Sequence, residues 1–137
     1  MPYNEKCPLC NLHKDKDQNI IFENETCYYV QHNLEQDVLE GCGLIIPKKH
    51  HENAFELTKE EWNDTYELLQ KAKQYVEDRY CPDGFTLGWN VGDASNQSIP
   101  HSHLHVIPRY NDEPHAGKGI RYWLKKPENK REKLKVK

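Results

Sequence analysis

The fold prediction starts from residues 90–109, which read NVGDASNQSIPHSHLHVIPR. Single residues separate the three histidines of this stretch, His101, His103 and His105. Side chains two residues apart in an extended strand point to the same face, so this spacing predicts three imidazoles on one face of a sheet. Each buried imidazole needs a hydrogen-bond partner, which makes such a face costly as ordinary core. The triplet therefore predicts a functional site.

Two kinds of site are compatible with the histidines themselves. Three converging imidazoles can bind a catalytic zinc ion and leave its fourth position open. Alternatively, one imidazole is a nucleophile, and its neighbours fix its tautomer and transfer protons.

Alternating and continuous apolar runs around the triplet predict five strands. A hairpin is predicted first, followed by a central strand that stops at Pro47 and, after the helix, by two further strands, the last of which ends at Pro108. The predicted strands are residues 20–23, 26–32, 43–47, 85–91 and 103–107.

One long helix is predicted over residues 58–80. Thr58 and Glu61 have the spacing of a capping box, which marks the start of a helix. The element order, with the helix between the third and fourth strands, predicts an α+β fold with a mostly antiparallel sheet. The residues expected on the buried face of the helix are Trp62, Tyr66, Leu69, Ala72, Val76 and Tyr80.

Length and charge predict one domain with a basic extension. The chain has 137 residues, a formal net charge of -3, 36% hydrophobic residues and a mean hydropathy of -1.02. The low apolar fraction suggests a partner that extends the core. Residues 1–110, the expected domain, have 10 basic and 18 acidic side chains, whereas residues 111–137 have 9 basic and 4 acidic ones. This extension, expected to be partly flexible, reads either as solvated chain or as an electrostatic guide for anionic ligands.

The expected location is the cytoplasm. No stretch approaches the roughly 20 apolar residues that a membrane helix needs, and residues 1–19 are too polar for a secretory signal. Five cysteines are an odd number without the spacing of a disulfide framework. Reduced thiols or a metal site are therefore expected.

Residues 90–109 resemble the signature of the histidine triad superfamily of nucleotide hydrolases and transferases. The resemblance continues upstream, because residues 44–50 (LIIPKKH) are similar to the family's strand that ends in Pro-Lys-x-His. It covers residues 7–110. It implies a HIT-like fold with one long and one short helix, and a sheet extended across the two-fold axis of a homodimer.

The resemblance also implies a chemistry. In the family, the middle histidine attacks the α-phosphorus of a nucleotide, and water then hydrolyses the nucleotidyl-histidine; here that position is His103. The implied donors to the phosphate are His105, Gln97 and Ser98, and Asn90 would orient the α-phosphate or its loop. Expected substrates are purine nucleotides such as dinucleoside polyphosphates or nucleoside phosphoramidates. Pro108-Arg109 is more similar to the dinucleoside polyphosphate hydrolase branch.

A Cys-x-x-Cys pair, Cys7 and Cys10, lies near the N-terminus. Alone it reads as a redox pair, as half of a zinc site or as coincidence, and no thioredoxin-like context supports the redox reading. Some histidine triad proteins and the related galactose-1-phosphate uridylyltransferases are similar here. The resemblance implies a structural Zn²⁺ on Cys7, Cys10, His50 and His101, with His51 as the alternative to His50.

Three positions depart from the family's pattern. Cys42 follows Gly41 where members often have a histidine. The ribose-binding acid is not evident, although residues 31–33 or Asp37 could occupy its place. Asn96 replaces a glycine, and asparagine tolerates a positive φ if the loop requires one.

Two other functions compete with hydrolysis. The chain could bind a nucleotide or a protein partner with little turnover, which the departures would explain. Processing of nucleic-acid ends, as in the aprataxin branch, ranks last because the body of the chain is acidic, so a nucleic-acid partner is not expected. Residues 117–124 (GKGIRYWL) read either as an aromatic anchor over the nucleotide or dimer partner, or as a plain docking segment.

Overall fold

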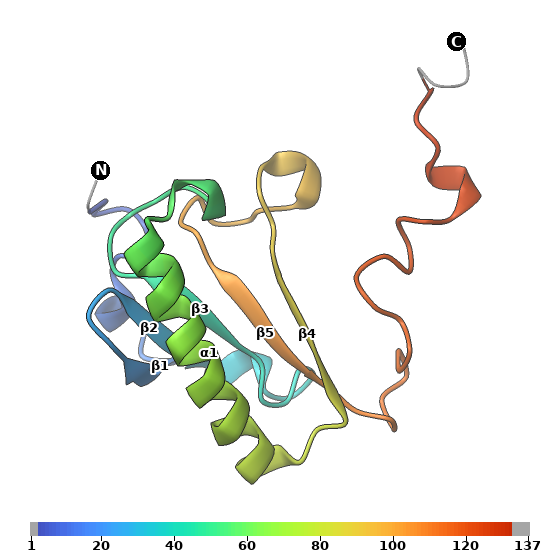
Figure 1. Cartoon of the computed structure of the whole chain (residues 1–137), viewed down its shortest axis with the longest axis horizontal. Helices are drawn as coiled ribbons and strands as arrows, with labels where there is room; N and C mark the ends of the chain where they lie inside the picture. The colour runs from blue at the N-terminus through green and yellow to red at the C-terminus, as the bar shows by residue number, and fades with distance from the viewer. Residues whose placement is uncertain (1–2, 133–137) are drawn as a thin grey trace.

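Five strands form one antiparallel sheet in the order β1-β2-β3-β5-β4 (Figure 1). The computed structural model describes residues 3–132. All five predicted strands are present in it, and β3 lies at the centre as expected. The strands are β1 (Gln18–Glu23), β2 (Cys27–His32), β3 (Gly43–Pro47), β4 (Gly84–Trp89) and β5 (Leu104–Arg109).

The predicted ends of the last two strands were wrong. β4 ends at Trp89, two residues early, and β5 starts one residue after His103. β5 also continues through Pro108, which pairs with Phe85. Because β3 pairs with β5 only as far as Val106, one side of β5 is open at Pro108, and a strand tolerates proline at such a position.

Helix α1 (Lys59–Tyr80) begins with the predicted capping box. The Thr58 hydroxyl accepts a hydrogen bond from the Glu61 amide at 3.1 Å, and the Glu61 carboxylate accepts one from the Thr58 amide at 2.8 Å. These two bonds satisfy backbone donors that a helix start leaves unpaired, which explains why the helix begins here.

The predicted buried face of α1 was wrong in its first half. Trp62 and Tyr66 are 43% and 65% exposed, and the Trp62 ring instead contacts the Trp89 ring at 4.8 Å between centroids. The buried side chains include two polar ones, which are hydrogen-bonded and which an apolar pattern cannot detect. The buried face consists of Glu61, Thr65, Leu68, Ala72 and Val76.

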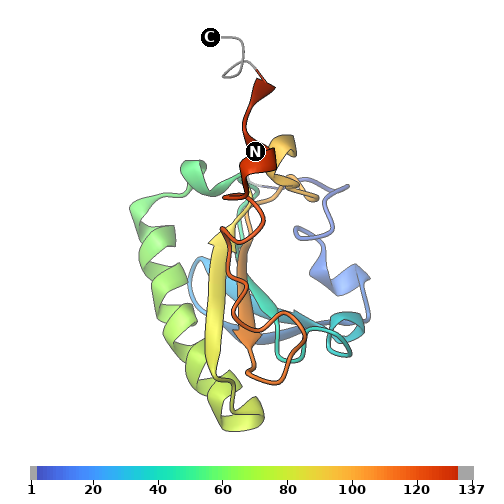
Figure 2. The same cartoon turned by 90° about the vertical axis from the view of Figure 1, so that its right-hand side faces the viewer.

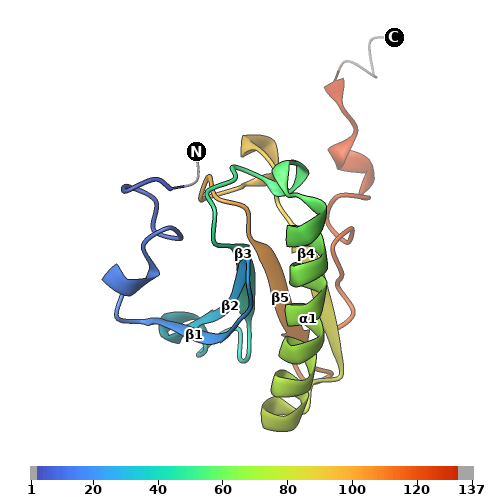
Figure 3. The ribbon, with the colours of Figure 1, turned by 60° about the vertical axis from the view of Figure 1, so that its left-hand side comes forward.

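The two faces of the sheet have different coverings (Figures 2 and 3). Helix α1 covers one face, where Leu68 and Ala72 pack with Leu104 and Val106. The N-terminal segment covers the other face and forms a second cluster of Cys7, Leu9, Leu12, Val30 and Ile46. Odd-numbered residues of β5, including His105, therefore face away from α1.

Single 3-10 turns make up the remaining helical structure. None of the helices formed by residues 3–132 is both long and apolar enough to cross a membrane. The extension that was predicted to be partly flexible, residues 111–137, includes residues 133–137, which lie outside the described residues. The turns are η1 (Leu12–Lys14), η2 (Asn33–Glu35), η3 (Ala54–Glu56), η4 (Asp93–Ser95) and η5 (Pro127–Asn129).

Gly43 allows the close approach of β2 to β3. A Cβ atom at this position would lie 2.6 Å from the Val30 carbonyl oxygen and 2.7 Å from Cε1 of Tyr29. We expect Gly43→Ala to lower the free energy of unfolding by about 2 kcal/mol, because buried backbone and a buried ring would have to shift. Urea denaturation measures this change. Gly84→Ala is the control, since a Cβ there meets nothing within 4 Å; equal effects of both substitutions would contradict the steric argument.

Candidate active site

The three histidines divide between two clusters. The His103 and His105 rings lie 5.0 Å apart between centroids, whereas the His101 ring contacts the His50 ring at 5.1 Å. His101 is fully buried, and His103 is nearly so. The triplet thus contributes side chains to two adjacent clusters.

The first cluster joins the N-terminal segment to the sheet. Sγ of Cys7 lies 3.4 Å from Nδ1 of His101, and Sγ of Cys10 lies 3.3 Å from Nδ1 of His50 and 3.5 Å from Nδ1 of His101. All four potential ligand atoms lie within 4.8 Å of one another. The structure therefore brings together the four residues predicted as zinc ligands.

The imidazole of His101 is oriented by the main chain. Its Nε2 donates a hydrogen bond to the Pro47 carbonyl at 2.9 Å, so Nδ1 turns its lone pair toward the two sulfur atoms. Burial lowers the pKa of His101 to about 4, which keeps the ring neutral. A neutral imidazole next to two thiols is the protonation state that a metal ligand needs.

His51 belongs to a different interaction. Its Nε2 lies 2.9 Å from the buried Glu61 carboxylate at the start of α1. Its carbonyl accepts a hydrogen bond at 2.7 Å from the amide of Ser102, the residue between His101 and His103 in the sequence. Of the two adjacent histidines, His50 is thus the one that lies with the cysteines.

In the second cluster, the His103 ring is oriented so that one of its nitrogen atoms can act as a nucleophile. Nδ1 of His103 donates a hydrogen bond to the His101 carbonyl at 2.7 Å, which leaves the lone pair of Nε2 free to attack. Burial and, to a smaller extent, the nearby His103 lower the pKa of His105. This neighbouring ring is therefore neutral near pH 7. Nε2 of His103, next to this neutral ring, is suitably placed for attack on a phosphorus atom.

The loop before the histidines is held by Gln97. Its side-chain oxygen accepts from the Gly92 amide at 2.9 Å, and its nitrogen donates to the Ile99 carbonyl at 3.0 Å and to the Glu52 carbonyl. Asn96 has a φ of 64°, the left-handed conformation for which asparagine was expected to substitute for glycine. Gln97 therefore closes the loop that also carries Ser98.

Asn90 lies at the end of β4 beside the histidines. Trp89 pairs with Leu104, and the next residues outward from that pair are Asn90 and His103. The structure therefore places Asn90 directly after β4 and His103 directly before β5, beyond the last residue pair of the two strands.

A cleft of about 550 Å³ opens beside His105. Nε2 of His32 lies 2.9 Å from the Asp15 carboxylate at this cleft, and Glu35 is a further acidic residue there. Neither Asp15 nor Glu35 was predicted from the sequence; Glu35 lies between residues 31–33 and Asp37, the positions expected to hold a ribose-binding acid, but no sequence pattern links Asp15 to the cleft. The lining residues are Pro8, Leu9, Asp15, Gln18, Val30, His32, Leu34, Glu35, Leu39, Cys42, Gly43, Leu44, Ile99, His105 and Ile107.

Cys42 lies on the wall of this cleft, where the resemblance implies a histidine. Burial raises the pKa of its thiol to about 11. The side chain is therefore uncharged at neutral pH and extends the apolar surface of the cleft instead of supplying a charge.

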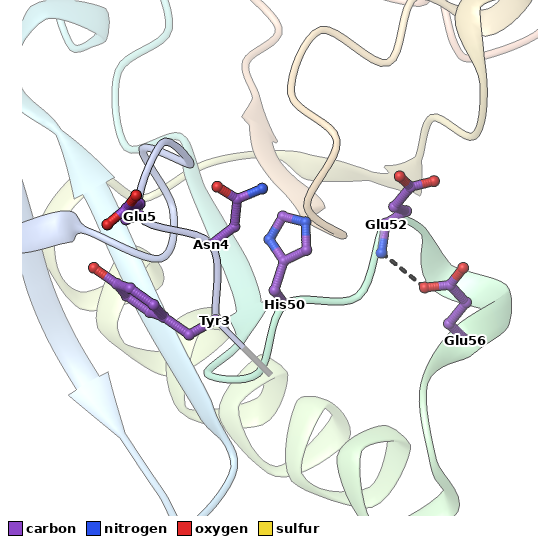
Figure 4. A pocket seen from close by; sticks show the side chains of 6 residues that line it. All are labelled: Tyr3, Asn4, Glu5, His50, Glu52 and Glu56. Carbon is purple, nitrogen blue, oxygen red and sulfur yellow. Dashed lines mark hydrogen bonds between the residues drawn. The ribbon is translucent and has the colours of Figure 1, made fainter. Parts of the chain in front are cut away.

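A second cleft, of about 660 Å³, is lined by His50 (Figure 4). Three carboxylates line it, those of Glu5, Glu52 and Glu56, and neither His103 nor His105 does. An acidic cleft that His105 does not line is unfavourable for a phosphate ester. The cleft beside His105 is accordingly the candidate active site.

Comparison with known proteins identifies the family of the chain. A family model described as "HIT domain" matches residues 13–112. The chain belongs to the HIT domain family. Within this family, it is 34% identical over 92 residues to a Dictyostelium discoideum protein named bis(5'-adenosyl)-triphosphatase, covering 67% of this chain and 61% of that protein. The chain spans between 50% and 61% of the length of two curated relatives that it matches.

Solved structures of HIT proteins have the same fold. A HIT family member from Bacillus subtilis is 31% identical, with a TM-score of 0.70 over 79% of this chain and 76% of that chain. A zinc-bound histidine triad family protein from Mycobacterium smegmatis is 26% identical, with a TM-score of 0.65 over 79% of this chain and 78% of that chain.

Proposed function

We propose that this HIT-domain protein is a nucleotide hydrolase that cleaves at the α-phosphorus and releases a nucleoside monophosphate. The observation that carries the proposal is the hydrogen bond from Nδ1 of His103 to the His101 carbonyl. It leaves Nε2 of His103 free as the nucleophile, next to the His105 ring that lines an apolar cleft. The names of relatives, bis(5'-adenosyl)-triphosphatase and bis(5'-nucleosyl)-tetraphosphatase, support dinucleoside polyphosphates as the substrate class.

The reaction proceeds in two displacements. In the first, Nε2 of His103 forms a bond to the α-phosphorus, the bond to the bridging oxygen breaks, and the leaving group departs with that electron pair. The Nδ1–H bond to the His101 carbonyl stabilises the positive charge that develops on the ring. In the second, water attacks the phosphorus, the P–N bond breaks, and AMP and His103 are released.

Residues around His103 have supporting roles in this mechanism. His105 would assist the leaving group from its place beside His103. Asn90 and Ser98 would orient the α-phosphate, and Gln97, which holds the loop, would present backbone amides to it.

The proposal includes a structural zinc ion on Cys7, Cys10, His50 and His101. The donor set fits zinc, because two thiols and two imidazoles are a common closed tetrahedral set and their donor atoms already converge. When bound, the ion would cross-link the N-terminal segment to the start of β5 without an open position for catalysis. His101 would then act on the reaction only through its carbonyl, which orients His103.

We also propose a homodimer. β4 is an edge strand, whose unpaired backbone groups on one side can pair with another strand. Exposed aromatic and aliphatic side chains lie on the same side of the molecule, on α1 and β4, and include Tyr66 and Leu87. Burial of this face would supply the additional core that the low apolar fraction suggests.

A substrate panel tests the proposed activity. We expect AMP release from diadenosine triphosphate, diadenosine tetraphosphate and adenosine 5'-phosphoramidate, with ADP, ATP and ammonia as the second products, measured by chromatography. All three share the adenosine and the α-phosphorus and differ only in the leaving group. Tight AMP binding without release from any of the three would contradict hydrolysis and favour a nucleotide-binding protein.

A further inference from the structure

One row of side chains crosses the sheet on the face opposite α1. Val30 of β2 pairs with Leu44 of β3, Leu44 pairs with His105 of β5, and His105 pairs with Gly88 of β4. Directly paired residues point to the same face, so the row is continuous. Val30, Leu44 and His105 line the cleft, and Gly88 lies beyond His105 on the far side.

The C-terminal segment lies over the end of this row. A Cβ atom at Gly88 would lie 3.6 Å from Cδ1 of Ile120, so Ile120 covers the position next to His105. Figures 1 and 2 show the segment running alongside β4 toward the end of the sheet at which β5 begins. The cleft and the segment therefore lie on opposite sides of the candidate active-site histidines.

Arg109 fixes the segment at this place. It lies four residues after His105 on the same strand, so its side chain is on the same face. Its guanidinium bonds the Glu113 carboxylate at 2.9 and 3.0 Å, the Thr86 hydroxyl at 3.0 Å and the Lys118 carbonyl at 2.9 Å. Such a fork of charge-assisted bonds orders the turn that leads into the segment.

The segment carries two ammonium groups on an aromatic pair. The rings of Tyr122 and Trp123 lie 4.7 Å apart, Nζ of Lys118 lies 5.2 and 5.5 Å from their centroids, and Nζ of Lys126 lies 4.6 and 5.4 Å from them. Trp123 is 61% exposed. Among the ion pairs that the structure describes within residues 3–132, none involves either lysine. Both charges are thus available to an anion, next to a ring on which a base can stack.

We propose that Lys118, Trp123 and Lys126 form the subsite for the leaving group, namely the polyphosphate and second nucleoside of a dinucleoside polyphosphate. This inference rests on the proposed function and deepens it. The cleft takes the first nucleoside, the α-phosphorus lies at His103, and the remaining phosphates extend across β5 toward the two lysines. The basic extension is then part of the active site, and it offsets the negative charge of the domain where the phosphates lie.

Binding to a protein without turnover tests the subsite independently of catalysis. In His103→Asn protein, we expect calorimetry to give a Kd for diadenosine tetraphosphate at least about tenfold lower than for AMP, which has no leaving group. Adding Lys118→Gln and Lys126→Gln should remove most of this tenfold difference. The matched control is Lys125→Gln with Lys130→Gln, which removes the same charge from two exposed positions of the same extension. If both pairs of substitutions reduce the difference in Kd equally, the effect is a general electrostatic attraction and the proposed subsite is wrong.

Turnover and oligomeric state complete the test. In otherwise unchanged protein, the first lysine pair should lower kcat/KM for diadenosine tetraphosphate about tenfold relative to that for adenosine 5'-phosphoramidate, mainly through KM. Trp123→Leu should lower the same ratio, because base stacking is lost. If no substrate is cleaved but the difference in binding is present, the proposed function fails and the subsite stands. If the variants instead dissociate a dimer in light scattering and leave the binding ratio intact, the segment docks on a second copy and the subsite is wrong.

Discussion

His103→Ala is expected to reduce AMP release from diadenosine tetraphosphate by at least about a thousandfold, because it removes the atom that forms the bond to phosphorus. The nearest alternative nucleophile, His105, is a separate ring whose centroid lies 5.0 Å away. Steady-state AMP release measures the loss. Acid quenching of the wild-type reaction should also trap a nucleotidyl group on His103, detectable by mass spectrometry of the peptide.

Two controls separate chemistry from folding in this experiment. His13→Ala removes an exposed histidine outside both clusters and should leave turnover unchanged. The Kd for AMP of the His103→Ala protein should remain within a few-fold of the wild-type value, since the cleft is lined by other residues. Undiminished turnover in His103→Ala would refute the assignment of the nucleophile.

The second large effect is expected from Cys10→Ala. This thiol lies next to both imidazoles of the first cluster, so its loss leaves an incomplete ligand set. Protein purified without added metal should contain about one equivalent of zinc, and the variant less than half of that. If free zinc exceeds its Kd a thousandfold, the lost binding corresponds to about 4 kcal/mol of unfolding free energy.

Chelation makes this prediction specific to the metal. A strong chelator should lower the urea midpoint of the wild type but not that of Cys10→Ala, which has already lost the site. Cys81→Ser is the matched control, because this exposed cysteine lies outside the cluster; it should respond to the chelator as the wild type does. Zinc content that is the same in Cys10→Ala as in the wild type would exclude the proposed ligand set.

The helix and most of the strand positions were predictable because the patterns that specify them involve residues close together in the sequence. The capping box of Thr58 and Glu61, the alternating strands and the tolerance of Asn96 for a positive φ each depend on a few neighbouring residues. The errors occurred where a residue or strand that is distant in the sequence determines the local structure. Glu61 is buried because His51 and the helix start satisfy its carboxylate, and Pro108 stays within β5 because β3 ends before it.

The α+β order of elements and the spacing of the three histidines on one strand-like segment are readable from the sequence, since periodicity and spacing act within one segment. Where each histidine side chain lies depends on the tertiary structure. Packing of the N-terminal segment against the sheet brings Cys7 and Cys10 to His101, and the sheet order places His50 there too. The same sheet order lines up the cleft, His105 and the segment around Ile120 in one row. Side chains from separate segments converge only after strands pair and cores close, so no local pattern encodes that convergence.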